Sequence, residues 1–219
     1  MDKKEIVSLF YKNKDADRGR EMSAYMRNHF PFLGIGSQKR ADLSRIFLSK
    51  IDKKEEIDWE FVCYCFNLPE REFTYLAISY LDKLKKNILP EDLSKFEQIA
   101  LIRPWWDSID SLSPLIGFVY LKYPIYSEKF INKWMNSDIF WLIRISIIFQ
   151  LKYKNNTNIE LLSKSILNNK NSNEFFINKA IGWALREYSK TNPSWVLEFV
   201  KSNKLSNLSE REALRIINR

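Results

Sequence analysis

Apolar residues recur at intervals of three and four along almost the whole chain, and this spacing constrains the fold more than any other feature. An amphipathic helix has that period, whereas a half-buried strand alternates with a period of two. Prolines fall where new helices can begin, because the first helical position needs no N–H donor. The pattern predicts about twelve helices and no strands. After residue 51 the predicted helices cover about 56–67, 70–86, 91–102, 105–122, 125–135, 138–152, 157–168, 173–190, 193–202 and a last segment from Ser209.

The links between these helices are short, and the chain holds only 5 glycines in 219 residues. Chains that need many tight turns usually carry more glycine. Successive helical hairpins without a long crossover suggest a solenoid of helix pairs. We therefore predict a single all-α domain over residues 1–219, with a concave side suited to an extended ligand.

The net charge of +8 favours an anionic partner such as nucleic acid or a membrane surface. No apolar run approaches the ~20 residues that span a bilayer. The charged start lacks the apolar core of a signal peptide. We expect a soluble cytoplasmic protein, with DNA or RNA as the leading candidate for the partner.

Few residues are available to hold a metal ion. Cys63 and Cys65 form a Cys-x-Cys pair, and His29 is the one histidine of the sequence. These are too few ligands for a tetrahedral zinc site, and no disulfide framework is visible. We expect reduced, mostly buried thiols and no metal.

The segment from Arg103 to Leu112 concentrates two tryptophans and two carboxylates. Pro104 suits the first position of a helix, and Asp107 suits its positive N-terminus. Trp106 and Asp110 are four residues apart, so in a helix they share a face. Two interpretations remain open at this point: a core tryptophan with a dipole partner, or an aromatic and a carboxylate that together meet a flat cation.

Arg144 is surrounded in its predicted helix by apolar neighbours three and four residues away. A guanidinium in that setting is costly unless an anion pairs with it or its head reaches water. The anion is either an internal Asp or Glu, or a phosphate held by the planar fork of the guanidinium. The residue types leave both alternatives open.

Trp183 lies between Lys179 and Arg186 on one predicted helix face, an arrangement that suits stacking on a base or sugar beside phosphate contacts. An ordinary core tryptophan with solvated flanks is the alternative. Gly182 in mid-helix costs about 1 kcal/mol relative to alanine. It suggests that something approaches the helix closely there.

Three further segments carry candidate features. Tyr25 offers an aromatic ring near the N-terminus, or is part of a plain amphipathic helix. The loop Gly34-Ile35-Gly36-Ser37 resembles a weak phosphate-binding loop before a helix that Ser37 can cap. Ser209 and Glu212 match a capping box, which predicts that the last helix begins at Ser209.

Taken together, these segments resemble the AlkD family of DNA glycosylases, which repair alkylated bases with a solenoid of HEAT-like helical repeats. The resemblance covers nearly the whole chain in consistent order. It rests on residues 25–28 and 32–35, on Trp105-Trp106-Asp107-Ser108-Ile109-Asp110, on Arg144 in its apolar helix, on residues 149–154 and on residues 179–188 with their Ile-Gly-Trp. The resemblance implies a right-handed solenoid of antiparallel helix pairs with a concave DNA-binding face.

The resemblance also implies an activity: a monofunctional glycosylase that releases cationic N3- and N7-alkylated purines (3-methyladenine, 7-methylguanine) from duplex DNA, without deep base flipping and without a cofactor. By motif, Asp110, Trp106 and Arg144 are carried over as the catalytic residues. Trp183 and Tyr25 are expected to bind DNA, together with Lys179 and Arg186. The stretch Gly36-Ser37-Gln38 departs from the family pattern, which puts any contact to the base there in doubt.

The expected chemistry fits these residue types, because an alkylated cationic purine is already a good leaving group. A carboxylate stabilises the positive charge that develops on the deoxyribose and positions a water molecule. An interior cleft needs no second subunit, so a monomer is expected. Two alternatives from other classes are a noncatalytic helical-repeat protein that binds DNA, and a scaffold for an acidic protein partner.

Overall fold

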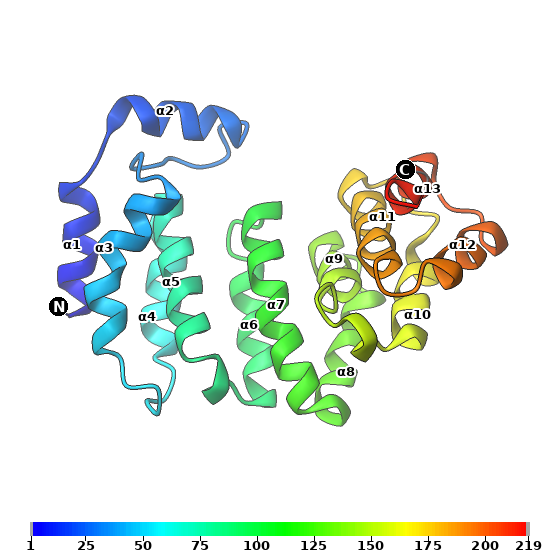
Figure 1. The fold of residues 1–219 in the computed structure, drawn as a ribbon. Helices are drawn as coiled ribbons and strands as arrows, with labels where there is room; N and C mark the ends of the chain where they lie inside the picture. The colour runs from blue at the N-terminus through cyan, green and yellow to red at the C-terminus, as the bar shows by residue number, and fades with distance from the viewer. Residues whose placement is uncertain (1, 218–219) are drawn as a thin grey trace. The chain divides into compact units, whose positions relative to one another are not determined.

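The computed structural model of the protein describes residues 2–217, and Figure 1 shows that their regular structure is entirely helical. These residues form 13 α-helices and three short 3-10 helices, with no strand, so the all-α prediction is confirmed for the part of the chain that the structure describes. The chain divides into two compact units, with the boundary between Leu89 and Pro90.

In the first unit, α3 packs against α1 and α5, and α4 packs against α5. The elements are α1 (Lys3–Lys12), α2 (Ala16–Tyr25), α3 (Ser37–Lys50), α4 (Trp59–Asn67), α5 (Arg71–Lys83) and η1 (Lys85–Asn87). Apolar side chains on the facing sides of these helices, such as Phe10, Phe66 and Phe73, are fully or almost fully buried. Such burial of aromatic rings stabilises the unit most, because each removes a large apolar area from water.

The glycine-containing loop before α3 binds an internal anion. The Glu72 carboxylate accepts hydrogen bonds from the backbone N–H groups of Leu33, Gly34 and Ile35 at 2.9–3.0 Å. The N–H groups of Gly34 and Ile35 are therefore bound to an acid of the same chain and are not open to a phosphate. The cap is different too: α3 begins at Ser37, so its N-cap is Gly36 and no side chain caps it.

In the second unit, α9 packs against both α7 and α11, and α11 packs against α13. Figure 1 shows α7, α9 and α11 in succession. The elements are η2 (Pro90–Asp92), α6 (Leu93–Ala100), α7 (Trp106–Lys122), α8 (Pro124–Met135), α9 (Phe140–Ile148), η3 (Lys154–Asn156), α10 (Ile159–Asn169), α11 (Phe175–Ser189), α12 (Pro193–Ser202) and α13 (Asn207–Leu214). This succession determines which side chains can meet in the candidate site.

Several predicted helix starts are confirmed. Pro124 and Pro193 occupy the first turns of α8 and α12, and the Asn192 side chain accepts a hydrogen bond from the N–H of Trp195. Pro104, however, is not the first helical residue. Arg103 adopts a left-handed backbone conformation with φ of 47°, and Trp105 is extended. The helix α7 therefore begins two residues after Pro104, at Trp106.

The N-cap of the last helix lies three residues earlier than the capping-box pattern indicates, and the helix begins at Asn207. Ser206 is the N-cap of α13, and its hydroxyl accepts from the N–H of Ser209. Ser209 is buried inside the helix, where its hydroxyl donates to the backbone carbonyl of Asn178 at 2.9 Å. The predicted capping role of Ser209 and Glu212 is wrong, because packing against α11 takes both side chains.

Cys63 and Cys65 are free thiols, and Cys65 is buried. Burial raises the pKa of the Cys65 thiol to about 12, so it stays protonated and unreactive. Among residues 2–217, no helix combines the length and the apolar character needed to cross a membrane.

Candidate functional site

A cavity with a volume of about 330 Å³ lies among α7, α9 and α11 of the second unit. It brings together six of the seven residues that the sequence singles out: Trp106, Asp110, Arg144, Lys179, Trp183 and Arg186. Phe175 and Phe176 complete the lining. The cavity thus joins a carboxylate, three cationic side chains and four aromatic rings.

The start of α7 separates its two tryptophans. Trp105 is the extended N-cap, and its ring packs against Trp141 and Phe176 with centroid distances of 5.8 Å and 5.2 Å. Trp106 is the first helical residue and lines the cavity with Asp110, one turn later. The predicted shared face of Trp106 and Asp110 is confirmed, and the neighbouring tryptophan anchors the start of the helix.

Arg144 forms a bidentate ion pair with Asp110. Its Nε donates to Oδ1 at 2.8 Å, and its Nη2 donates to Oδ2 at 2.9 Å. The side chain of Arg144 is 4% exposed and that of Asp110 is 19% exposed. Of the two alternatives for the anion beside Arg144, the structure has the internal carboxylate. Parallel N–H···O bonds of this kind fix the orientation of the carboxylate as well as its charge.

The same guanidinium also contacts α11. Its Nη1 donates to the backbone carbonyl of Phe176 at 2.6 Å, and the guanidinium carbon lies 5.9 Å from the centroid of the Trp183 ring. Arg144 on α9 therefore connects Asp110 on α7 with the N-terminal half of α11. A guanidinium with its five donors suits such a junction better than an ammonium does.

Burial raises the pKa of Asp110 above its ordinary value, and the negative charge of Asp107 adds to this effect. The hydrogen bonds and positive charge of Arg144 act in the opposite direction. Asp107 lies in the first turn of α7, where a carboxylate interacts favourably with the helix dipole, and it is buried there. Asp110 thus lies in a poorly hydrated place where its charge acts strongly on nearby groups.

The two cations that flank Trp183 share one acidic partner, Glu212. The sequence pattern had placed Glu212 in a capping box with Ser209 instead. Lys179 Nζ lies 2.6 Å from Glu212 Oε1, and Arg186 Nη1 forms an ion pair with Glu212 Oε2. The side chain of Glu212 is 9% exposed. The hydrogen bond from Lys179, followed by the positive charges, holds the pKa of Glu212 below its ordinary value, so Glu212 remains a carboxylate.

Gly182 explains how Glu212 reaches this position. A Cβ atom at Gly182 would lie 2.5 Å from Cβ of Glu212 and 2.8 Å from the carbonyl oxygen of Ser209. The close approach that the sequence suggested at Gly182 is made by α13 of the same chain. Only glycine lets the two helices come this near.

Tyr25 is the seventh expected residue, and it lies in the first unit. It is the last residue of α2, and it is 73% exposed. The cavity itself is formed without any residue of the first unit.

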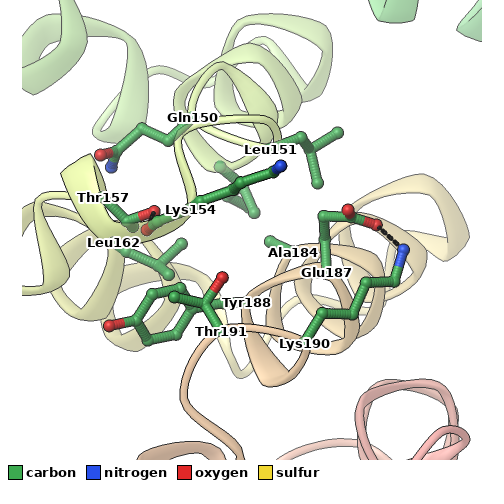
Figure 2. A pocket seen from close by; sticks show the side chains of 11 residues that line it. Gln150, Leu151, Lys154, Thr157, Leu162, Ala184, Glu187, Tyr188, Lys190 and Thr191 are labelled. Carbon is green, nitrogen blue, oxygen red and sulfur yellow. Dashed lines mark hydrogen bonds and ion pairs between the residues drawn. The ribbon is translucent and has the colours of Figure 1, made fainter.

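A second cavity of the same unit, with a volume of about 360 Å³, contains none of the expected residues. Figure 2 shows Lys154 extending over it and the Glu187–Lys190 ion pair on one side. Its other lining residues are Ile147, Gln150, Leu151, Thr157, Leu162, Ala184, Tyr188 and Thr191. No carboxylate in it is held by an arginine, so it lacks the arrangement seen at Asp110.

Sequence reasoning missed Phe175, Phe176 and Glu212. The two phenylalanines read as ordinary apolar residues at the start of a helix. The sequence did indicate an acid such as Glu212 indirectly, because Lys179 and Arg186 lie on one partly buried helix face, where cations need a negative partner. The spacing of Glu212 from Ser209 favoured a local interpretation instead.

Comparisons with known proteins agree on one family. The family model described as DNA alkylation repair enzyme matches residues 6–217. A solved structure, the predicted DNA alkylation repair enzyme from Enterococcus faecalis, is similar with a TM-score of 0.86 and 32% sequence identity. The similarity covers 94% of this chain and 98% of the other. A comparison with curated proteins found no match.

Proposed function

Because the chain belongs to the DNA alkylation repair enzyme family, we propose that it is a monofunctional DNA glycosylase. Its proposed substrates are cationic N3- and N7-alkylated purines in duplex DNA, such as 3-methyladenine and 7-methylguanine. It hydrolyses their N-glycosidic bond without drawing the base into a deep pocket. The helix pairs are proposed to be HEAT-like repeats, and the protein to act as a cytoplasmic monomer.

One observation carries this proposal. Asp110 is a largely buried carboxylate that Arg144 holds in place, and it lines the same cavity as Trp106 and Trp183. A fixed negative charge in a poorly hydrated site stabilises positive charge that develops in a transition state, and it needs no reorganisation to do so. Aromatic faces favour a cation as well. The cavity is therefore suited to a reaction in which a flat cation forms.

The reaction needs no acid at the base. When the bond between C1′ and the purine nitrogen breaks, its electron pair goes to the cationic base, which leaves as a neutral molecule. Positive charge then develops on the deoxyribose, where Asp110 stabilises it. A water molecule positioned by Asp110 adds to C1′ and loses its proton to the carboxylate or to solvent.

The other residues bind and orient in this proposal. Arg144 holds Asp110 through its two parallel hydrogen bonds. Trp106 and Trp183 border the sugar and its backbone, while Lys179 and Arg186 contact phosphates. Tyr25 contributes a DNA contact from the first unit. The net charge of +8 supplies affinity that is independent of base sequence and falls with salt.

The test compares wild type with Asp110→Asn on a duplex that carries one 7-methylguanine. Asparagine keeps the shape but removes the charge, so release of the base should fall about 100-fold or more. Binding to the undamaged duplex should persist. Asp82→Asn is the matched control: Asp82 is exposed on α5 and pairs with Lys85 outside the cavity.

Equal base release by wild type and Asp110→Asn would overturn the assignment of the carboxylate. If wild type binds the duplex but releases neither 7-methylguanine nor 3-methyladenine, the noncatalytic DNA-binding alternative is correct. If a competition binding assay shows no preference for DNA over another polyanion of equal charge, the scaffold for an acidic protein partner is favoured instead.

The pH dependence offers an independent test. Because the pKa of Asp110 is raised, the carboxylate is lost as the pH falls through a value above that of a free aspartate. Base release by wild type should therefore decline on the acid side at a higher pH than the titration of an ordinary aspartate predicts. The residual release by Asp110→Asn should lack this acid limb, as single-turnover rates across pH would show.

A further inference from the structure

The Lys179–Glu212–Arg186 triad lies at the edge of the candidate site. Glu212 on α13 binds both cations, and both cations line the cavity on either side of Trp183. The exposed fractions of the Lys179 and Arg186 side chains are 38% and 21%, against 9% for Glu212. The acid is thus buried behind two cations that still reach the surface.

Glu212 is not free to leave this position. Ser209, three residues earlier on α13, donates its hydroxyl hydrogen to the carbonyl of Asn178, and Gly182 allows the helices to touch. Pulling both cations away would leave a buried charge without partners, which is strongly unfavourable. An incoming phosphate therefore meets the triad as a unit rather than displacing Glu212.

Both cations keep hydrogen-bond donors for such a phosphate. A lysine ammonium has three N–H donors and a guanidinium has five. Within the part of the chain that the structure describes, Glu212 accepts one bond from Lys179 and one from Arg186. The remaining donors can meet an anion at the cavity, while the triad as a whole carries a single net positive charge.

We propose that Glu212 is a positioning residue that makes Lys179 and Arg186 a single phosphate clamp at the rim of the cavity. It fixes the two cations on either side of Trp183 and limits their combined attraction for the DNA backbone to that of one charge. This inference rests on DNA as the proposed substrate, but not on base release.

The experiment measures binding of Glu212→Gln to an undamaged duplex across a salt series. Neutralising each additional phosphate changes the slope of log K against log[salt] by about −0.9. Replacing Glu212 by glutamine raises the net charge of the triad from one to two. The slope should therefore become steeper by about 0.9, and binding at low salt should strengthen. A merely structural role of Glu212 predicts weaker binding with no steeper slope.

The matched control is Glu97→Gln, which makes the same change in net charge elsewhere in the unit. Glu97 also has two partners, because it accepts from Lys133 and from the indole N–H of Trp134, but it does not line the cavity. Its slope should equal that of wild type. A second variant, Glu212→Gln with Lys179→Gln, restores a single net charge at the rim and should return the slope to the wild-type value.

An unchanged slope in folded Glu212→Gln, or an equal steepening in Glu97→Gln, would overturn the proposal. Circular dichroism establishes that each variant is folded. If Glu212→Gln is not, Gly182→Ala provides the test, because its Cβ displaces Glu212 from the two cations: its slope should steepen, and an unchanged slope would overturn the proposal. Failure of the proposed glycosylase activity appears separately, as absence of base release by wild type, and leaves the slope measurement intact.

Discussion

Each unit contains a buried glutamate that binds groups from another part of the chain, and the two differ in what they bind. Glu72 in the first unit is fully buried and accepts three backbone N–H groups. Glu212 in the second unit binds two cationic side chains that reach the surface. A glycine accompanies each acid: Gly34 donates to Glu72, and Gly182 makes room for Glu212.

The difference separates an anion that holds the fold from one that shapes a binding surface. Backbone N–H groups cannot turn to water or to a ligand, so the hydrogen bonds of Glu72 fix the loop before α3. The partners of Glu212 are long side chains with donors to spare, and solvent reaches them. Burial of an acid therefore says little about its function until its partners are known.

The largest expected effect is the loss of stability in Glu72→Gln. The glutamine amide can accept through only one of its two terminal atoms, so a buried N–H loses its partner and the charge-assisted bonds weaken. We expect the free energy of unfolding to fall by about 3 kcal/mol. Urea denaturation measures this. If Glu72→Gln lost less free energy of unfolding than Glu212→Gln, the distinction between a fold-stabilising Glu72 and a surface-shaping Glu212 would be wrong.

Gly182→Ala should have the next largest effect. Its Cβ would lie 2.5 Å from Cβ of Glu212 and 2.8 Å from a backbone oxygen, so α13 has to shift. Overpacking of this kind costs about 1–3 kcal/mol. In addition, the salt dependence of duplex binding should move in the direction seen for Glu212→Gln, because the shift separates Glu212 from its cations. An alanine variant with wild-type stability would show that the approach of α13 is loose.

Glu212→Gln itself should be a milder change. Lys179 and Arg186 can recover water when the carboxylate is lost, so we expect a destabilisation of about 1 kcal/mol. Thermal unfolding with Glu97→Gln alongside provides the measurement. A cost equal to that of Glu72→Gln would place Glu212 among the residues that hold the fold.

The smallest effect concerns pH. The pKa of Glu212 is lowered by its cations, so its contribution to stability is present above the pKa of an unfolded glutamate and is lost as the pH falls through the lower, folded value. Between neutral pH and about pH 3, wild type should therefore lose more stability than Glu212→Gln does. Parallel curves of unfolding free energy against pH for wild type and Glu212→Gln would contradict this expectation.

Local features of the site could be predicted from the sequence, whereas its partners could not. The spacing of Trp106 and Asp110 placed them on one face, because helical geometry needs only neighbouring residues. The apolar surroundings of Arg144 indicated that an anion must meet it, but Asp110 lies 34 residues away. Which acid fills that place depends on how α7 and α9 pack.

Glu212 shows how a local pattern can mislead. Its spacing from Ser209 matches a capping box, and the same two residues are instead drawn onto α11 by buried contacts. Nothing in the sequence around Glu72 indicated that it binds the loop before α3, because an acid near the start of a helix is common. Helix content followed readily from periodicity, whereas the long-range role of each acid depended on tertiary packing that overrides local preference.

The junction at Arg144 also bears on how the second unit unfolds. Helices that touch only their neighbours can open one at a time from an end. A single guanidinium that binds a carboxylate of α7 and a carbonyl of α11 from its place on α9 couples three successive helices. Opening any one of them exposes a buried charge on another, so amide hydrogen exchange in α7, α9 and α11 should follow one common opening free energy.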